Sequence, residues 1–151
     1  MEEGDIVKSN IIKGEFKEKL SLPFSEGGAF AGFPSPAQDY MDDDSIDFNR
    51  DFVKHPSATF YCRVRGNSMI DAGIEDGDLA MIDRAEEAED GDIVLAVING
   101  EFTIKYLDLS EKNKGKIWLR AANEDYPSFK VTPDDQFEVW GVIVNVIKNF
   151  K

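Results

Sequence analysis

The sequence is poor in cysteine and histidine and lacks a long apolar run, three features that often indicate the class of a protein. Its 151 residues include one cysteine, Cys62, and one histidine, His55. A single cysteine excludes a disulfide framework within one chain. A single histidine placed directly before a proline disfavours a Ser-His-Asp triad. The longest apolar stretches, IVLAVI and WGVIVNVI, have the length of strands and fall far short of the roughly 18 residues that a membrane-spanning helix needs.

Basic residues are also scarce. Seventeen Lys and Arg face 30 Asp and Glu, which gives a net charge of −13. Binding to nucleic acid relies on clustered basic side chains, so this balance argues against direct sequence-specific DNA binding. The first 28 residues open with acids and are interrupted by charge throughout, unlike a leader peptide. We therefore expect a soluble, cytoplasmic protein without a membrane association and without a bound cofactor or metal.

The apolar pattern changes near residue 56. Earlier residues show no sustained period, so residues 1–45 are interpreted as an extended, weakly ordered N-terminal arm. Later residues alternate between apolar and polar in short runs, the period of half-buried strands. These runs cover residues 59–65, 78–83, 92–98, 101–109, 116–121, 128–131 and 137–147. The pattern predicts a mostly β domain over residues 46–151.

Turn signals separate these strands. Asp-Gly-Asp occurs at residues 76–78 and again at 90–92, and it predicts a tight turn in both places, because the ligand spacing of a calcium-binding EF-hand loop is absent. Asn99-Gly100 predicts a type I′ hairpin. The last strand is apolar on both faces in WGVIVNVI, which predicts burial on both sides by the core or by a partner subunit.

Two stretches suggest peptidase chemistry. Ala29-Phe30-Ala31 followed by Gly32 has the small-x-small form that processing peptidases recognise. Ser68 lies after a predicted strand and a glycine, where a short helical turn would leave backbone N–H groups available to stabilise an oxyanion. Gly-Asn-Ser is also an ordinary turn sequence, so this pattern alone leaves a structural role for Ser68 open.

A serine nucleophile without histidine can use a neutral lysine as its base. Lys105 is the best candidate, because strand alternation puts it on one face with Leu107 and Leu109, and because the Asn99-Gly100 hairpin fixes the register of its strand. Most other lysines lie in charged, solvent-facing segments. A surface lysine whose ammonium extends to water remains the alternative for Lys105.

Four motifs together carry a resemblance to a known family. They are GFPSPAQDY, HPSATFYCRVRGNSMIDAGIEDGDLAMID, GDIVLAVINGEFTIKYL and VWGVIVNVIK, which occur in this order between residues 32 and 148. The chain resembles the LexA/UmuD-like serine-lysine peptidases (S24) over residues 22–151, and in particular the UmuD-type members, the self-cleaving subunits of translesion DNA polymerase V.

The resemblance implies a fold and a reaction. The fold is a LexA-like peptidase domain of twisted, partly open β-sheets. Ser68 would be the nucleophile and Lys105 the general base. The bond cut would join Ala31 to Gly32, and the backbone N–H groups of Ser68 and Met69 would form the oxyanion hole. Cleavage would be stimulated by the RecA filament on single-stranded DNA. The processed homodimer would then join a UmuC-type Y-family polymerase in error-prone translesion synthesis during the SOS response.

The chain departs from the family pattern in two ways. UmuD proteins usually have Cys-Gly at the cut, whereas Ala31-Gly32 has the form found in LexA repressors. The arm is longer than in UmuD, yet too short for the winged helix-turn-helix of LexA, so a repressor function is disfavoured. Two alternatives stay open: a non-enzymatic, β-rich dimeric binding module, and a Ser-Lys peptidase that acts in trans on other proteins.

Overall fold

The structure is a computed structural model that describes residues 11–23, residue 31 and residues 45–151. The chain divides into two compact units. The sheet unit comprises residues 1–14 and 57–151, and the small unit comprises residues 15–56. Ala31 lies in the small unit, and Gly32 lies outside the described residues. The predicted division into an arm of 45 residues and a domain from residue 46 stays a prediction.

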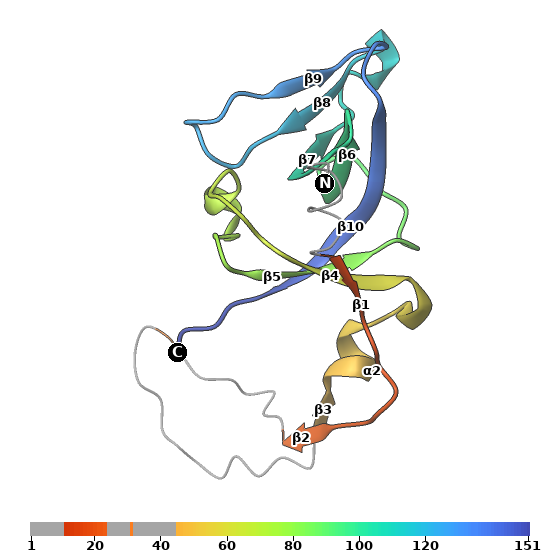
Figure 1. The fold of residues 1–151 in the computed structure, drawn as a ribbon, viewed down its shortest axis with the longest axis vertical. Helices are drawn as coiled ribbons and strands as arrows, with labels where there is room; N and C mark the ends of the chain where they lie inside the picture. Colours follow the sequence, from red (N-terminus) through yellow and green to blue (C-terminus); the bar gives the residue numbers. More distant parts are fainter. Residues whose placement is uncertain (1–10, 24–30, 32–44) are drawn as a thin grey trace. The chain divides into compact units, whose positions relative to one another are not determined.

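Within the described residues, the sheet unit contains one eight-stranded sheet (Figure 1). Its strands are β1 (Ile11–Lys13), β4 (Thr59–Arg63), β5 (Leu79–Asp83), β6 (Ile93–Ile98), β7 (Glu101–Asp108), β8 (Ile117–Arg120), β9 (Phe129–Val131) and β10 (Phe137–Ile147). They follow the order β1-β4-β5-β10-β6-β7-β8-β9, and all neighbours are antiparallel. The mostly β fold is confirmed, and each predicted strand is present.

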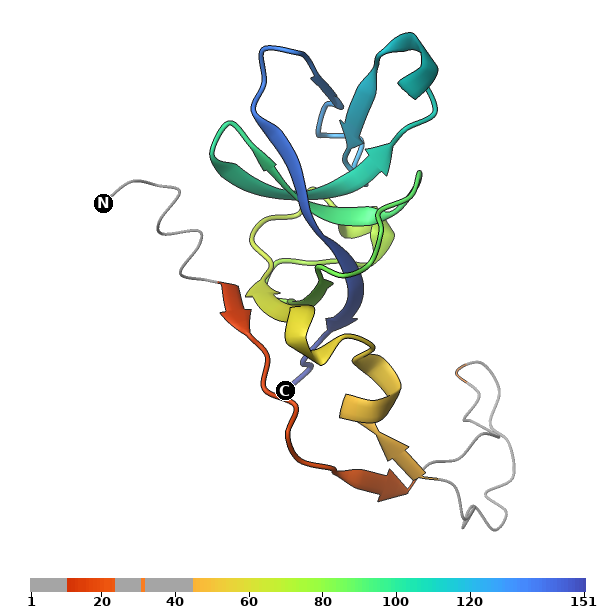
Figure 2. The same cartoon turned by 90° about the vertical axis from the view of Figure 1, so that its right-hand side faces the viewer.

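The long strand β10 joins two halves of this sheet, and Figure 2 shows it passing along the unit. Its first half pairs with β6 and its second half pairs with β5. The register shifts between Val139 and Gly141, and again between Ile143 and Asn145. Such bulges bend a strand and increase its twist. Gly141 and Val142 are buried, while Val144 and Ile147 are exposed, so the core covers the middle of the strand and burial of the rest by a partner subunit stays a prediction.

Tight turns fix the register of these strands. Asn99 and Gly100 have φ values of 50° and 83°, the two positive angles that a type I′ hairpin requires. In the Asp-Gly-Asp turns, the carboxylates of Asp78 and Asp92 each accept from the amide three residues earlier, in both cases at 2.8 Å. The predictions of turns at these three positions are confirmed.

Two clusters of buried side chains stabilise the sheet unit. One cluster lies around β4, β5 and the segment that carries Ser68, and its buried members include Cys62, Val64, Met69, Ile74, Ile82 and Leu95. The other lies between β6, β7, β8 and β10, with Val94, Ala96, Leu107, Leu119 and Val142. Leu107, on the strand face that alternation assigns to Lys105, is only 3% exposed.

The small unit has a hairpin-like pair of strands, β2 (Ser21–Pro23) and β3 (Ser45–Asp47), which are antiparallel. The helix α2 (Phe48–Phe52) follows directly. Asp47 caps it, because its carboxylate accepts from the amides of Asn49 and Arg50. These elements were not predicted from the sequence, since three-residue strands and a five-residue helix are too short to show a period.

The other helices of the described residues are short and of the 3-10 type: Pro56–Ala58, Ile70–Ala72 and Lys112–Lys114. Across the described ranges, no helix has the length and apolar character needed to cross a membrane.

Candidate active site

Lys105 lies in the middle of β7, between β6 and β8 in the sheet. Its Cα is paired with that of Val94, a residue of β6 that is completely buried. The hairpin at Asn99 and Gly100 connects these two strands and sets their register. The backbone of the sheet therefore fixes where the Lys105 side chain begins.

The Lys105 amine makes three polar contacts. Its Nζ lies 2.9 Å from Ser68 Oγ, 3.0 Å from Thr103 Oγ1 and 3.2 Å from the carbonyl oxygen of Ile104. The side chain is partly buried, and this burial lowers the pKa of Lys105 because a charged ammonium is disfavoured away from water. The alternative of a lysine extended to solvent is not what the structure shows.

Ser68 reaches this lysine from a different part of the sheet. Three strands, β5, β10 and β6, lie between β4 and β7 in the strand order, yet the segment after β4 brings Ser68 to Lys105. Gly66 makes the turn after β4 with a φ of 84°, and its amide donates to Asp76 Oδ1 at 2.7 Å. Met69, only 3% exposed, anchors the next residue in the core.

The backbone around Ser68 leaves two donors available. No acceptor for the amides of Ser68 and Met69 is found within the part of the chain that the structure describes, whereas the carbonyl of Ser68 accepts from Ala122 N at 2.8 Å. Unpaired amides beside a serine are the groups that stabilise an oxyanion during acyl transfer. The predicted oxyanion hole at Ser68 and Met69 stays a prediction, but this arrangement suits it.

A cavity of about 250 Å³ opens beside these groups. Its lining comes from β1, β4, the turn after β4, β6 and β7, and includes Ile11, Cys62, Val64, Met69, Leu95 and Phe102 together with Ser68 and Lys105. The lining combines these apolar side chains with Arg63, Arg65 and Lys105, so it disfavours a basic segment of peptide. Burial raises the pKa of Cys62 to about 11, so this thiol stays protonated and unreactive at neutral pH.

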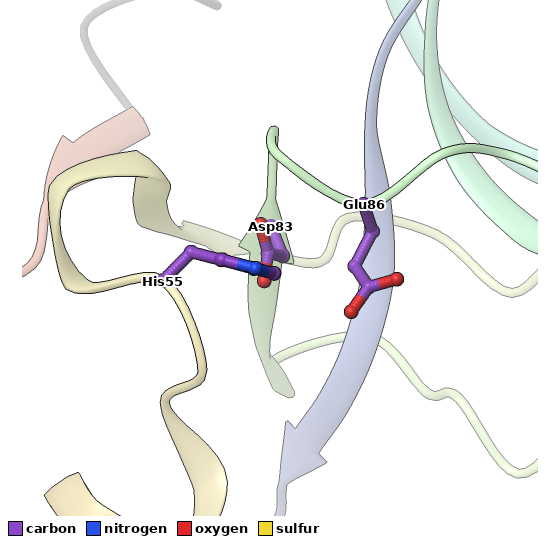
Figure 3. Close-up of side chains that lie close together, drawn as sticks. All are labelled: His55, Asp83 and Glu86. Carbon is purple, nitrogen blue, oxygen red and sulfur yellow. The ribbon is translucent and has the colours of Figure 1, made fainter.

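Two aspartates of the sheet unit, Asp78 and Asp83, are buried, and each accepts a hydrogen bond from a nearby backbone amide. Asp83, 2% exposed, closes β5 and accepts from the amide of Ala85, which turns the chain towards Glu86 (Figure 3). Asp78, 6% exposed, accepts from the amide of Glu75 and pairs with Lys148. The sheet unit contains no histidine in its sequence, since His55 belongs to the small unit.

The bond predicted to be cut can be described on one side only. Ala31 is exposed. Gly32 lies outside the described residues. An exposed position is what a peptide bond needs in order to enter a peptidase cavity.

Two side chains near the site were not predicted from the sequence. Thr103 lies two residues before Lys105, and strand alternation puts the two on one face, so the pattern that found Lys105 could also have found Thr103. Asn123 donates from Nδ2 to the carbonyl of Asn67 at 3.0 Å. Nothing local to Asn123 indicates this contact, because its partner is 56 residues away.

The sequence of this chain is similar to those of known proteins. Residues 23–144 match the family described as Peptidase S24-like. The chain belongs to that family. Protein MucA of Salmonella typhimurium is 41% identical over 126 residues, which cover 83% of both proteins. Protein ImpA of Shigella flexneri is 42% identical over 117 residues, covering 78% of this chain and 77% of ImpA.

A third relative is longer than this S24 member. The LexA repressor of Shewanella woodyi is 38% identical over 141 residues, which cover 92% of this chain and 65% of that repressor. Together with MucA and ImpA, this likeness identifies the chain as a UmuD-like member of the S24 family. It is thus related to self-cleaving serine peptidases as a class.

Proposed function

We propose that Ser68 and Lys105 form a serine-lysine dyad that cuts the chain's own Ala31–Gly32 bond. The observation that carries this proposal is the 2.9 Å contact between Lys105 Nζ and Ser68 Oγ. This distance lies within the range over which a base can take a proton from a hydroxyl. The partial burial of Lys105 supports the proposal, because it favours the neutral amine that the reaction requires.

The three contacts of Lys105 suit a neutral amine. A neutral amine has two N–H donors and one lone pair. It can donate to Thr103 Oγ1 and to the Ile104 carbonyl, which leaves the lone pair for the Ser68 hydroxyl. Thr103 and the Ile104 carbonyl therefore orient the lone pair towards Ser68. We assign Thr103 the role of a positioning residue.

The reaction then proceeds in two steps. Lys105 takes the proton of Ser68 as Oγ attacks the carbonyl carbon of Ala31, and the oxyanion accepts hydrogen bonds from the backbone amides of Ser68 and Met69. The bond to the Gly32 nitrogen breaks, and that nitrogen leaves as an amine with the proton from Lys105. Lys105 then takes a proton from a water molecule that attacks the ester between Ala31 and Ser68, and it returns this proton to Ser68 Oγ as the ester bond breaks. The products are residues 1–31 and residues 32–151.

Self-cleavage needs little affinity for substrate. A bond that belongs to the same assembly as the nucleophile is present at a high effective concentration, so positioning replaces tight binding. Control of the reaction then amounts to control of when Ala31 enters the cavity. We propose that the RecA filament on single-stranded DNA provides this control, as the resemblance to UmuD-type chains implies.

The processed product is proposed to act as a homodimer. On β10, Val144 is 38% exposed and Ile147 is 47% exposed. Exposed apolar side chains on a strand are suited to contact a second copy of this chain. We propose that this dimer joins a UmuC-type Y-family polymerase in error-prone synthesis past DNA lesions. The net charge of −13 supports a role in which the polymerase, not this chain, contacts DNA.

Replacement of the nucleophile tests the proposal. The Ser68→Ala variant should fold, since it removes one oxygen from a half-buried side chain, and it should stay intact during incubation with RecA filament. A matched control is Ser110→Ala, which changes an exposed serine of the same unit and should leave cleavage unchanged. Cleavage at Ala31–Gly32 by purified Ser68→Ala would contradict the dyad. Multiple turnover on unrelated peptides would favour a peptidase that acts in trans.

A further inference from the structure

The turn that carries Ser68 is held from outside by one loop. We name residues 121–126, which follow β8, the clamp loop. Its Ala122 amide donates to the Ser68 carbonyl at 2.8 Å, and its Asn123 side chain donates from Nδ2 to the Asn67 carbonyl at 3.0 Å. A third bond runs in the opposite direction, from the Asp71 amide to the Ala122 carbonyl at 2.8 Å. The clamp loop therefore contacts the turn on both sides of Ser68.

These two carbonyls determine where two amides point. A trans peptide unit is planar, with its C=O and N–H on opposite sides. The Asn67 carbonyl shares its plane with the Ser68 amide, and the Ser68 carbonyl shares its plane with the Met69 amide. A donor that fixes the carbonyl oxygen of such a unit also fixes the direction of its N–H. The two bonds from the clamp loop thus orient the same two amides that the proposed reaction uses.

Asn123 is itself held in place by its own loop. Its Oδ1 accepts from the Asp125 amide at 3.0 Å, and its backbone carbonyl accepts from the Tyr126 amide at 3.0 Å. With Oδ1 held by the Asp125 amide, the planar side-chain amide is oriented with Nδ2 at the Asn67 carbonyl. Both ends of the Asn123 amide are therefore used, one to shape the loop and one to hold the serine turn.

We infer that Asn123 is a positioning residue for the oxyanion hole, acting on the Ser68 amide through the Asn67 carbonyl. This inference rests on the proposed function, because an oxyanion must form for the orientation of the amide to matter. Asn123 does not touch the reacting atoms in this account. The bond from the Ala122 amide has the equivalent role for Met69, but as a backbone group it cannot be removed by changing a side chain. Asn123 is the part of the clamp that substitution can test.

Two substitutions separate the functions of Asn123. Asn123→Asp keeps the shape and the acceptor for the Asp125 amide, but it replaces the Nδ2 donor with an oxygen that faces the Asn67 carbonyl. Asn123→Ala removes both bonds. Loss of an oxyanion-hole donor lowers turnover by about 10²–10³-fold, so misdirecting one amide should slow self-cleavage by about 10- to 100-fold at the high-pH plateau. Asp125→Ala, an exposed change in the same loop, is the matched control and should cleave like the unaltered chain.

The pH profile distinguishes positioning from a general structural role. We measure the first-order rate of self-cleavage against pH for the unaltered chain and the three variants, with the melting temperature of each. We expect Asn123→Ala to lower the plateau without moving the midpoint of the profile, because the surroundings of Lys105 are unchanged. Asn123→Asp should also lower the plateau, and it remains informative if the alanine variant folds poorly.

Three results would overturn the inference. Unaltered plateau rates in both Asn123 variants would show that the clamp does not act on catalysis. A lower rate explained wholly by a shifted midpoint, or by unfolding at the assay temperature, would give Asn123 a structural role only. If the unaltered chain does not cleave at any pH, the proposed function fails together with the inference. Cleavage by the unaltered chain and by both variants at one rate would reject the inference alone.

Discussion

The two residues of the proposed dyad lie in opposite kinds of structure. Lys105 lies in a regular strand with neighbours on both sides, and the backbone ladder fixes its position. Ser68 lies in a turn outside the ladder, held by bonds from Ala122 and Asn123. A base that must be neutral benefits from burial in a sheet, whereas a nucleophile beside an oxyanion hole needs amides that no strand partner has taken.

The two residues should therefore be sensitive to changes in different parts of the molecule. The contribution of Lys105 to self-cleavage should depend on its amine and on the packing of the sheet around it. The contribution of Ser68 should depend on the clamp loop, which holds the turn that carries it. Substitutions in the sheet and in the clamp loop therefore have different expected effects.

Removal of the base gives the largest effect. Lys105→Met keeps a long, flexible side chain but has no amine, so Ser68 loses the group that takes its proton. We expect self-cleavage to fall by about 10⁴-fold while the fold is retained, because methionine suits the apolar surroundings. Intact mass over time measures this loss. Lys112→Met, in an exposed 3-10 helix, is the control, and cleavage by Lys105→Met at the unaltered rate would remove Lys105 from the mechanism.

A substitution in the sheet tests the packing between β10 and β5. A Cβ at Gly141 would lie 2.5 Å from Ile82 Cγ2, and Ile82 is completely buried. Gly141→Ala should therefore lower the free energy of unfolding by about 1–3 kcal/mol, the usual cost of overpacking a core. Denaturant unfolding measures it. Val144→Ala, at an exposed position of the same strand, should cost less than about 1 kcal/mol. Equal stabilities would show that β10 tolerates extra volume here.

A smaller effect is expected at Thr103. Thr103→Val has the same shape but lacks the oxygen that accepts from Lys105 Nζ, so the lone pair of the amine is less well directed towards Ser68. A hydrogen bond contributes about 0.5–1.5 kcal/mol, which corresponds to a rate up to about tenfold lower. Thr103→Ser keeps the hydroxyl and should restore the rate. If the valine variant cleaves as fast as the serine variant, the hydroxyl has no positioning role.

The regular part of the fold was predictable from the sequence, and the contacts between distant segments were not. Alternating side chains identified every strand from β4 to β10, and Asn99-Gly100 located the hairpin before Lys105. β1 was missed because Ile11 and Ile12 are too few to show a period, and its pairing with β4 joins residues about 50 positions apart. The role of Asn123 was missed for the same reason, because nothing near it in the sequence marks a partner at Asn67.

The central claim is that a neutral Lys105 activates Ser68, and its most direct test is the pH dependence of self-cleavage. Burial lowers the pKa of Lys105, so the neutral fraction rises with pH and becomes complete above the lowered value. Below that value, we expect the rate to rise about tenfold per pH unit and then to level off. Intact mass should show only residues 1–31 and 32–151. A chain that stays whole at every pH, or a rate that is independent of pH, would contradict the account.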